Sequence, residues 1–311
     1  MPVSRDADLP IIDAHHHFWD MSHKAHPWLR DEPMIPFRYG DYSSIRRDFL
    51  PADYWALTRE HNVVATVTME GEWDEGDLVD ESAWMTQVAA ASGLPAAHIA
   101  RTILHEDGAA EELARHAAYP IVRGIRHKPA AAPGPGLVER GAAGGMTDPS
   151  WRRGYAALAP NKLHFELQAP WWHVDGLLDL IGAYPETPVV INHAFMPVDR
   201  TAEGLAGWRA AIKRAASAPQ ASMKISGIGI KGQPWQLQDQ RPIIDGLIDA
   251  FGSGRCMFAS NFPVDSLVGS FDTIYSGFKD ATSDLPRADR VKLFHDNAVR
   301  IYRLDVPLQS T

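Results

Sequence analysis

The sequence predicts an α/β protein that folds as one (β/α)8 TIM barrel, a single domain over residues 1–311. Two patterns lead to this prediction. Short apolar runs alternate with longer amphipathic segments, and eight such strand–helix pairs follow one another without a break in composition. The length agrees, because barrels of about 250 residues or more often form one domain. With 45% hydrophobic residues, the chain can bury a large core.

Four strands are predicted in the first half of the chain, at residues 11–14, 63–69, 99–104 and 121–126. Helices are predicted between them at residues 51–61, 80–92 and 108–118. The stretch 23–42 is rich in proline and aromatic residues, which predicts irregular structure. Residues 130–146 are rich in Gly, Ala and Pro and predict a loop.

The second half repeats this alternation. Its predicted strands are residues 163–168, 188–192, 221–226 and 256–260. Its predicted helices are residues 151–159, 174–184, 202–217, 241–251, 271–281 and 287–302. Strands joined by crossover helices run parallel, so their C-terminal ends meet at one rim. A barrel of this kind carries its active site at that rim.

Composition and charge exclude several kinds of partner. The formal net charge of −9 argues against a nucleic acid or an anionic membrane. The single cysteine, Cys256, excludes an intramolecular disulfide and fits a reducing compartment. Residues 1–10 do not resemble a signal or transit peptide, and no apolar run is long enough for a membrane span. We therefore expect a cytoplasmic protein that acts on a small molecule, and leave open whether it forms a homo-oligomer.

The first predicted strand runs directly into three histidines. Side chains alternate along a strand, so His15 and His17 share one face, with Cβ atoms about 6.5 Å apart, and His16 points the other way. Two imidazoles at that spacing can hold one metal ion or one substrate oxygen. A surface histidine cluster is the alternative interpretation. The position directly after a buried strand favours a functional site.

Polar side chains also stand near the ends of five other predicted strands: Glu70, Gln168, His193, Lys224 and Asn261. Counting by twos places Val189, Ile191 and His193 on one face of the sixth strand. Each residue has a structural alternative, because His193 can be a packed histidine, Lys224 a surface group and Glu70 a solvated acid. Their common position at strand ends favours one shared site with His15 and His17.

Basic residues cluster at the end of the fourth predicted strand. Arg126, His127 and Lys128 follow one another, and an Arg offers a planar fork that matches a carboxylate. We expect Arg126 to bind an anionic part of the substrate, with His127 as a hydrogen-bonding neighbour. A solvated basic turn is the alternative. Trp19 is a candidate for the pocket wall, although core packing is an equally good role for it.

Five segments resemble one known family: residues 12–20, 26–29, 123–127, 256–265 and 296–302. They are similar to the amidohydrolase-2 branch of the amidohydrolase superfamily. Within that branch they resemble the lactonase group that includes L-fuconolactonase, L-rhamnono-lactonase and 2-pyrone-4,6-dicarboxylate lactonase. The resemblance implies an amidohydrolase-like barrel, and it covers nearly the whole chain.

The resemblance also implies roles for individual residues. His15 and His17 match the family's first-strand pair, and His193 matches the histidine that ends the sixth strand. Gln168 stands where zinc-dependent members have a histidine, and Asn261 replaces the aspartate that orients or deprotonates water. Both differences weaken metal binding. A divalent metal, zinc, held by His15, His17 and His193 therefore remains one alternative, and a metal-independent enzyme the other.

The function that follows is a hydrolase that opens a small lactone bearing a carboxylate. The catalytic group is then His15, His17, His193, Asn261 and Asp265, with Asp265 reaching back to assist the attacking water. The expected substrate-binding residues are Glu70, Arg126, His127, Gln168, Lys224 and Trp19. Two other functions stay open: a metal-dependent decarboxylase of the same branch, and a non-catalytic barrel that binds a small ligand.

Overall fold

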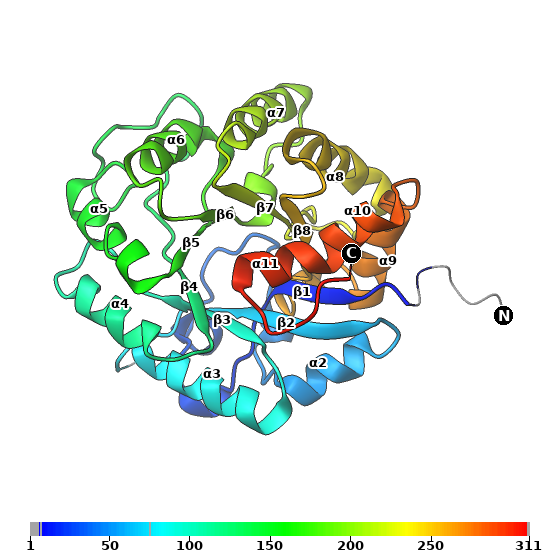
Figure 1. Cartoon of the computed structure of the whole chain (residues 1–311), viewed down its shortest axis with the longest axis horizontal. Coiled ribbons are helices and arrows are strands. Elements are labelled where there is room, and N and C mark those ends of the chain that lie inside the picture. Colours follow the sequence, from blue (N-terminus) through cyan, green and yellow to red (C-terminus); the bar gives the residue numbers. More distant parts are fainter. Residues whose placement is uncertain (1–5, 7, 75, 310–311) are drawn as a thin grey trace.

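Eight parallel strands form the centre of the molecule in the computed structural model, which describes residues 6, 8–74 and 76–309 (Figure 1). In order around the sheet they are β1 (Ile11–His16), β2 (Val63–Met69), β3 (Ala97–Arg101), β4 (Val122–Arg126), β5 (His164–Leu167), β6 (Val189–Ile191), β7 (Ala221–Ile225) and β8 (Cys256–Phe258). A parallel bridge between His16 and Phe262 joins the two ends of the sheet, and the His17 backbone N–H donates to the Phe262 carbonyl (2.7 Å). The predicted (β/α)8 barrel is confirmed.

Helices surround the strands on the outside (Figure 1). The outer ring contains α2 (Pro51–Thr58), α3 (Val79–Ser92), α4 (Ala109–Ala117), α5 (Pro149–Tyr155), α6 (Val174–Ala183), α7 (Ala202–Ala216), α8 (Leu237–Phe251) and α9 (Phe271–Ala281). Their starts follow ordinary capping chemistry, since the side chains of Asp148, Thr201 and Ser270 accept a hydrogen bond from the first turns of α5, α7 and α9. No helix among the described residues is long and apolar enough to cross a membrane.

Shorter elements complete the chain. They are α1 (Pro27–Arg30), α10 (Arg287–Val291), α11 (Asn297–Tyr302), a π-helix η7 (Lys292–Asp296), and the 3-10 turns η1 (Met21–His23), η2 (Ser43–Ile45), η3 (Ala159–Asn161), η4 (Trp171–His173), η5 (His193–Phe195) and η6 (Val264–Leu267). The helix α1 interrupts a stretch predicted to be irregular. Pro27 opens it at the first position, where a missing N–H leaves no hydrogen bond unmade.

Several predicted boundaries were wrong. The third strand begins two residues early and ends at Arg101, and η7 splits the predicted last helix. The helix α8 starts four residues before the predicted position and contains Pro242. Gln240 in its first turns is buried and accepts a hydrogen bond from Arg200 (3.3 Å). Such tertiary contacts hold this turn in place although Pro242 offers no backbone N–H.

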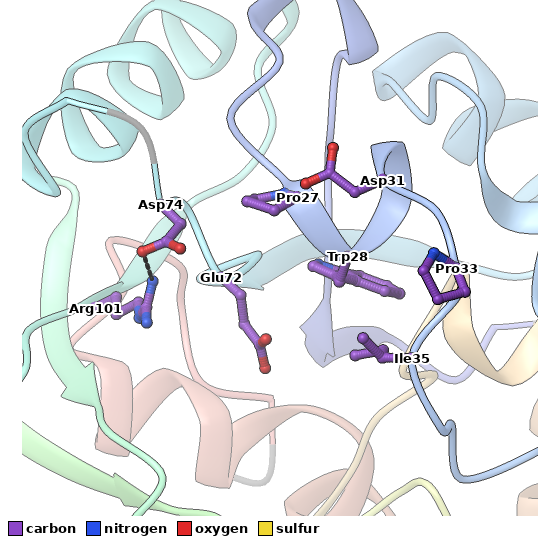
Figure 2. A pocket seen from close by; sticks show the side chains of 8 residues that line it. All are labelled: Pro27, Trp28, Asp31, Pro33, Ile35, Glu72, Asp74 and Arg101. Atoms are coloured by element: carbon purple, nitrogen blue, oxygen red, sulfur yellow. Dashed lines mark ion pairs between the residues drawn. The ribbon is translucent and has the colours of Figure 1, made fainter.

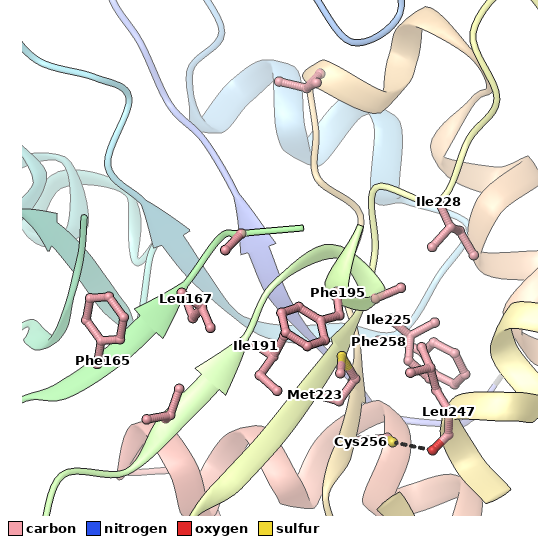
Figure 3. Packing of buried hydrophobic residues seen from close by; sticks show 14 of the residues in the cluster. Phe165, Leu167, Ile191, Phe195, Met223, Ile225, Ile228, Leu247, Cys256 and Phe258 are labelled. Atoms are coloured by element: carbon pink, nitrogen blue, oxygen red, sulfur yellow. Dashed lines mark hydrogen bonds between the residues drawn. The ribbon is translucent and has the colours of Figure 1, made fainter. Parts of the chain in front are cut away.

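The buried apolar residues of the strands fall into two clusters. One packs the strands against the outer helices, and Figure 3 shows it for β5–β8, where the Cys256 thiol donates to the Leu247 carbonyl of α8 (3.5 Å). The other joins inward residues such as Val190 and Met257 to α11. In Figure 1, α11 lies across one end of the barrel. Its Tyr302 hydroxyl donates to the buried Glu166 carboxylate (2.9 Å).

The prediction that Val189, Ile191 and His193 share one face of the sixth strand was wrong. Val189 and Ile191 pack with the outer helices, whereas Val190 lies in the inner cluster, so His193 does not continue their face. Four consecutive residues, 193–196, have positive φ angles between 51° and 58°. This left-handed turn redirects the chain after Asn192 and carries the His193 side chain toward the barrel axis. The Trp208 indole stabilises the turn by donating to the Ala194 carbonyl (2.8 Å).

Candidate active site

Three imidazoles lie together at the C-terminal end of the barrel. The ring centroids of His15 and His17 are 5.3 Å apart, and those of His15 and His193 are 4.5 Å apart. His16 points away from them and packs on the ring of Tyr54 in α2, with 4.5 Å between the centroids. Alternation along β1 predicted this division of the three histidines.

Hydrogen bonds to the Nδ1 atoms orient two of these rings. His17 Nδ1 lies 3.2 Å from the Met69 carbonyl oxygen, which can only accept, so this nitrogen carries the proton and Nε2 carries a lone pair. His193 Nδ1 lies 3.0 Å from the Ser226 hydroxyl, which can donate or accept. Neither ring nitrogen of His15 has a hydrogen-bond partner among the described residues, although the ring is fully buried. No protein hydrogen bond among the described residues therefore fixes the tautomer of His15.

All three imidazoles are neutral near pH 7. Burial lowers the pKa of each ring well below its ordinary value. Neighbouring positive charges lower these pKa values further, Arg126 acting on all three rings and Lys224 on His15 and His193. The carboxylate of Glu70 acts in the opposite direction on His17 alone. His17 is thus the one of the three rings on which a carboxylate opposes the cations, although the Arg126 charge has the larger effect on its pKa.

Asp13 joins β1 to the segment that follows β8. Its carboxylate accepts hydrogen bonds from the Ser260 backbone N–H (2.8 Å), the Ser260 hydroxyl (2.6 Å) and the Tyr54 hydroxyl (2.9 Å). The next backbone N–H, that of Asn261, donates to the His15 carbonyl (2.7 Å). These bonds hold Asn261 beside the histidines, in a left-handed conformation (φ 56°) that asparagine tolerates well.

Asn261 and Asp265 form a hydrogen-bonded pair. The Asn261 amide nitrogen donates to Asp265 Oδ1 (2.6 Å), and the Tyr39 hydroxyl donates to the same oxygen (3.1 Å). Burial raises the pKa of Asp265 to about 6. Because the amide nitrogen of Asn261 is turned toward the carboxylate, its carbonyl oxygen remains available as an acceptor.

A cavity of about 240 Å³ opens beside these groups. Six of the predicted site residues line it: His17, Glu70, Arg126, Gln168, His193 and Asn261. Loop residues form the rest of the wall: Trp28, Ile35, Pro36, Phe37, Arg38, Gly71, Glu72, Lys128 and Val264. His15 lies against His193 beneath the cavity, and Asp265 stands behind Asn261.

Most charged groups around this cavity are already paired. Arg126 Nε lies 2.5 Å from Glu70 Oε1, and its two terminal nitrogens donate to the Glu70 carbonyl (2.9 Å) and to Gln168 Oε1 (3.1 Å). Lys128 is paired with Glu72. Burial by itself would raise the pKa of Glu70, but the charges of Arg126, Lys128 and Arg101 lower it to about 2. Arg126 is therefore neutralised within the protein.

Arg38 differs from these cations. Its guanidinium donates to the Gly227 carbonyl (2.8 Å), and the described residues include no acidic side chain within ion-pair distance of it. A Cβ atom added to Gly227 would lie 2.6 Å from His193 Nδ1 and 2.9 Å from Arg38 Nη1, so both groups pack over this glycine. Arg38 thus places a positive charge beside His193, and this charge also lowers the pKa of the nearby Asp265 carboxyl.

A second cavity of about 270 Å³ adjoins the first and shares Trp28, Ile35 and Glu72 with it. Figure 2 shows these three side chains near the centre of the view, with Asp31 and Asp74 around them. The one cation of this cavity, Arg101, is paired with Asp74 (3.6 Å). This outer cavity is lined by three acidic side chains, and each is paired with a cation: Asp31 with Arg30, Glu72 with Lys128 and Asp74 with Arg101.

Comparison with known proteins agrees with this geometry. A family model described as amidohydrolase matches residues 12–304. The chain belongs to the amidohydrolase family. The uncharacterized protein y4mH of Sinorhizobium fredii is 34% identical, over 96% of this chain and 100% of y4mH. An L-fucono-1,5-lactonase of Burkholderia ambifaria is 28% identical, over 95% of this chain and 96% of the lactonase.

A solved structure shows the same architecture. The crystal structure of an amidohydrolase from Burkholderia multivorans with bound zinc has a TM-score of 0.77 and 25% identity, over 94% of this chain and 99% of that one. The predicted resemblance to amidohydrolases and their lactonase group is confirmed, and so is the prediction that the chain is a hydrolase.

The donor set of this amidohydrolase does not form a metal centre as the residues stand. Three neutral imidazoles suit zinc in kind. However, no three His, Cys, Asp or Glu side chains of the described part of the chain are grouped so that they could hold one metal ion. The amide nitrogen of Asn261 is bonded to Asp265, and Arg126 places positive charge near His15 and His17. The predicted metal set of His15, His17 and His193 is thus not supported by the geometry of the described residues.

Three predicted substrate-binding residues lie away from the cavity. Lys224 is fully buried inside the barrel, with Nζ 3.0 Å from Glu166 Oε2. His127 Nδ1 accepts from the Leu104 backbone N–H (3.2 Å). Trp19 is completely buried behind His17, with their ring centroids 5.9 Å apart. We give these three residues structural roles, because each is satisfied by protein partners.

Sequence reasoning missed Arg38, a cation of the cavity wall that has no acidic side chain within ion-pair distance among the described residues. It lies in the proline- and aromatic-rich stretch after β1, where periodicity carries no information. One signal was available. A long segment that follows the C-terminal end of a barrel strand lies over the active-site face, so an arginine within it is a candidate ligand for an anion.

Proposed function

We infer that this amidohydrolase hydrolyses a small lactone, a cyclic ester, that carries an acidic group. The similarity to an L-fucono-1,5-lactonase over nearly the full length of both chains supports this reaction class. One observation carries the proposal: His17, His193 and Asn261 line one cavity in which Arg38 has no acidic partner among the described residues. The site therefore offers a base, a hydrogen-bond donor and an anchor for an anion.

Water attack begins at His17. Its Nε2 lone pair accepts a proton from water as the oxygen bonds to the lactone carbonyl carbon. The carbonyl oxygen of Asn261 accepts a second hydrogen bond from the same water and orients it, while Asp265 holds the amide in place. The carboxylate of Glu70 stabilises the imidazolium that forms, consistent with its effect on the pKa of His17.

The developing negative charge falls on the former carbonyl oxygen. His193 stabilises it by donating from Nε2, provided that the Ser226 hydroxyl donates to His193 Nδ1. His15 packs against His193 and helps to hold its ring. The tetrahedral intermediate then collapses, the ring C–O bond breaks, and the His17 imidazolium returns its proton to the leaving oxygen. The product is an open-chain hydroxy acid.

Arg38 takes the anchoring role that the sequence suggested for Arg126. A carboxylate on the substrate would receive charged hydrogen bonds from the Arg38 guanidinium, next to His193. Arg126 instead shapes the cavity wall through Glu70 and Gln168.

The test is product analysis on a panel of sugar lactones and pyrone carboxylates. Release of acid without CO₂ supports the proposal, and CO₂ release would identify the decarboxylase alternative. Binding of a panel compound without turnover would identify a non-catalytic barrel.

The His17→Gln variant should lose at least about 10²-fold in kcat, the scale of losing a general base, with its thermal unfolding unchanged. His105→Gln, which alters an exposed histidine, is the matched control and should keep wild-type turnover. Undiminished kcat in His17→Gln would contradict the assignment of the base.

A further inference from the structure

A third cavity, of about 170 Å³, lies on the other side of Arg38 from the candidate active site. The loops after β6 and β7 form most of it, together with the loop after β1. Three cationic side chains line it, those of Arg38, Arg200 and Lys231, and no acidic side chain does so among the described residues. The cavity is therefore strongly positive.

No ion pair among the described residues neutralises the two arginines. Arg200 is partly buried, and one of its terminal nitrogens donates to the Ile228 carbonyl (2.6 Å) and to Gln240 Oε1 (3.3 Å). Both acceptors are uncharged. Burial lowers the pKa of Arg200, although Tyr39 and Asp239 act in the opposite direction. Two partly buried guanidinium groups held only by neutral acceptors carry an unrecovered desolvation cost, which a bound anion would offset.

The lysine is held near the two arginines by loop packing. Its stem lies against the loop that carries Arg38, since a Cβ atom on Gly40 would lie 3.3 Å from Lys231 Cε. The loop after β7 thus contacts the loop after β1 at the edge of the cavity. A flexible lysine at an open edge and two fixed guanidinium groups suit an oxyanion that enters from solvent.

Arg38 lies between this cavity and the candidate active site. It lines both cavities, and its guanidinium packs over Gly227 together with the ring of His193. The outer cavity around Asp31, Glu72 and Asp74 lies beyond Trp28 and Ile35, on a different wall of the site. A substrate would therefore direct a second acidic group toward Arg200, and its neutral or hydroxylated part toward the outer cavity.

We propose that the cavity lined by Arg38, Arg200 and Lys231 is a second anion subsite, which takes a carboxylate or phosphate on the part of the substrate remote from the lactone ring. The identity of the substrate rests on the proposed function. Anion binding by the three cations does not, so it can be measured without turnover.

The experiment is calorimetric titration of the full chain with succinate, inorganic phosphate and acetate. Succinate or phosphate should bind more tightly than acetate, because each can engage both Arg38 and Arg200. Arg200→Gln and Lys231→Gln should each weaken that binding by about tenfold or more, the scale of a lost charged hydrogen bond. Arg214→Gln is the matched control, since Arg214 is exposed on α7 and paired with Asp175.

Lys231 is exposed and makes no hydrogen bond on which the fold depends among the described contacts, so its variant tests the proposal even if Arg200→Gln unfolds. If Arg200→Gln and Lys231→Gln bound succinate and phosphate as tightly as wild type does, the proposed subsite would be overturned. So would a lack of any saturable binding.

Lactone assays separate this proposal from the proposed function. If no lactone turns over but anion binding depends on Arg200 and Lys231, the function fails and the subsite stands. If lactones turn over, and Arg200→Gln has the same kcat/KM for substrates with one and with two acidic groups, the function stands and the subsite fails.

Discussion

Buried charged side chains inside the barrel form an ion pair, whereas two arginines at its loop-covered end donate only to uncharged groups among the described residues. Inside, Lys224 and Glu166 are both fully buried and form an ion pair, and Tyr302 and His164 bond to the same carboxylate. At the loop-covered end, Arg38 and Arg200 donate only to uncharged acceptors of the described chain. The strand-borne Lys224 is neutralised within the fold, whereas Arg38 and Arg200 in the loops have no acidic partner among the described residues, and we propose that they bind an anion. This difference separates the positive side chains that stabilise the fold from those available to bind a ligand.

The largest effect should come from breaking the interior pair. Lys224→Met leaves Glu166 buried without its counter-ion, so the free energy of unfolding should fall by about 3–5 kcal/mol. Urea unfolding followed by circular dichroism measures this loss. The double variant Lys224→Met/Glu166→Gln should recover most of it, because Gln is uncharged and can still bond to Tyr302 and His164. A loss below about 1 kcal/mol in the single variant would show that the pair does not support the fold.

Asp265 should show the next largest effect, because it is a buried carboxylate bonded to neutral donors. Its pKa is raised from 3.8 to about 6, so the folded state binds its proton more strongly than the unfolded state does. The Asp265 contribution to stability is therefore present below pH 4 and is lost as pH rises through 6. Two pKa units correspond to about 3 kcal/mol. Relative to wild type, Asp265→Asn should gain about that much stability between pH 4 and pH 7.

The measurement is urea unfolding of both proteins across this pH range, with wild type as the reference at each pH. The buried histidines change stability in both proteins alike, so the difference isolates Asp265. A difference that does not change with pH would mean that the Asp265 pKa is unperturbed by folding.

Arg38 should show the smallest effect on free energy, and it should appear in binding rather than in stability. Arg38→Gln should raise KM for an acid-bearing lactone by about 10- to 100-fold, with kcat changed much less. The matched comparison is Arg126→Gln, which removes a paired arginine and should destabilise the fold by leaving Glu70 uncompensated. Equal KM values for wild type and Arg38→Gln, with a raised KM in Arg126→Gln, would restore the anchoring role to Arg126.

Local periodicity predicted much of the site, and the predictions from periodicity that failed have a common cause. Counting by twos separated His15 and His17 from His16 on β1, and Gln168, expected near the end of the fifth strand, does line the cavity. The same count failed for β6, which ends at Ile191, because the left-handed residues 193–196 follow at once. Period two is a property of extended backbone. It carries no information beyond the last residue of a strand.

The sequence by itself determined the barrel and the paired histidines of β1. Eight alternating units and the order along one strand are encoded by neighbouring residues, so no long-range contact is needed to predict them. Only the tertiary structure decided which cations are free. Arg126 is neutralised by Glu70, which lies 56 residues away in the chain, and Lys224 by Glu166, whereas Arg38 donates to a backbone carbonyl and forms no ion pair among the described residues. The net charge at a site depends on pairs that distant strands and loops bring together, and no local pattern encodes them.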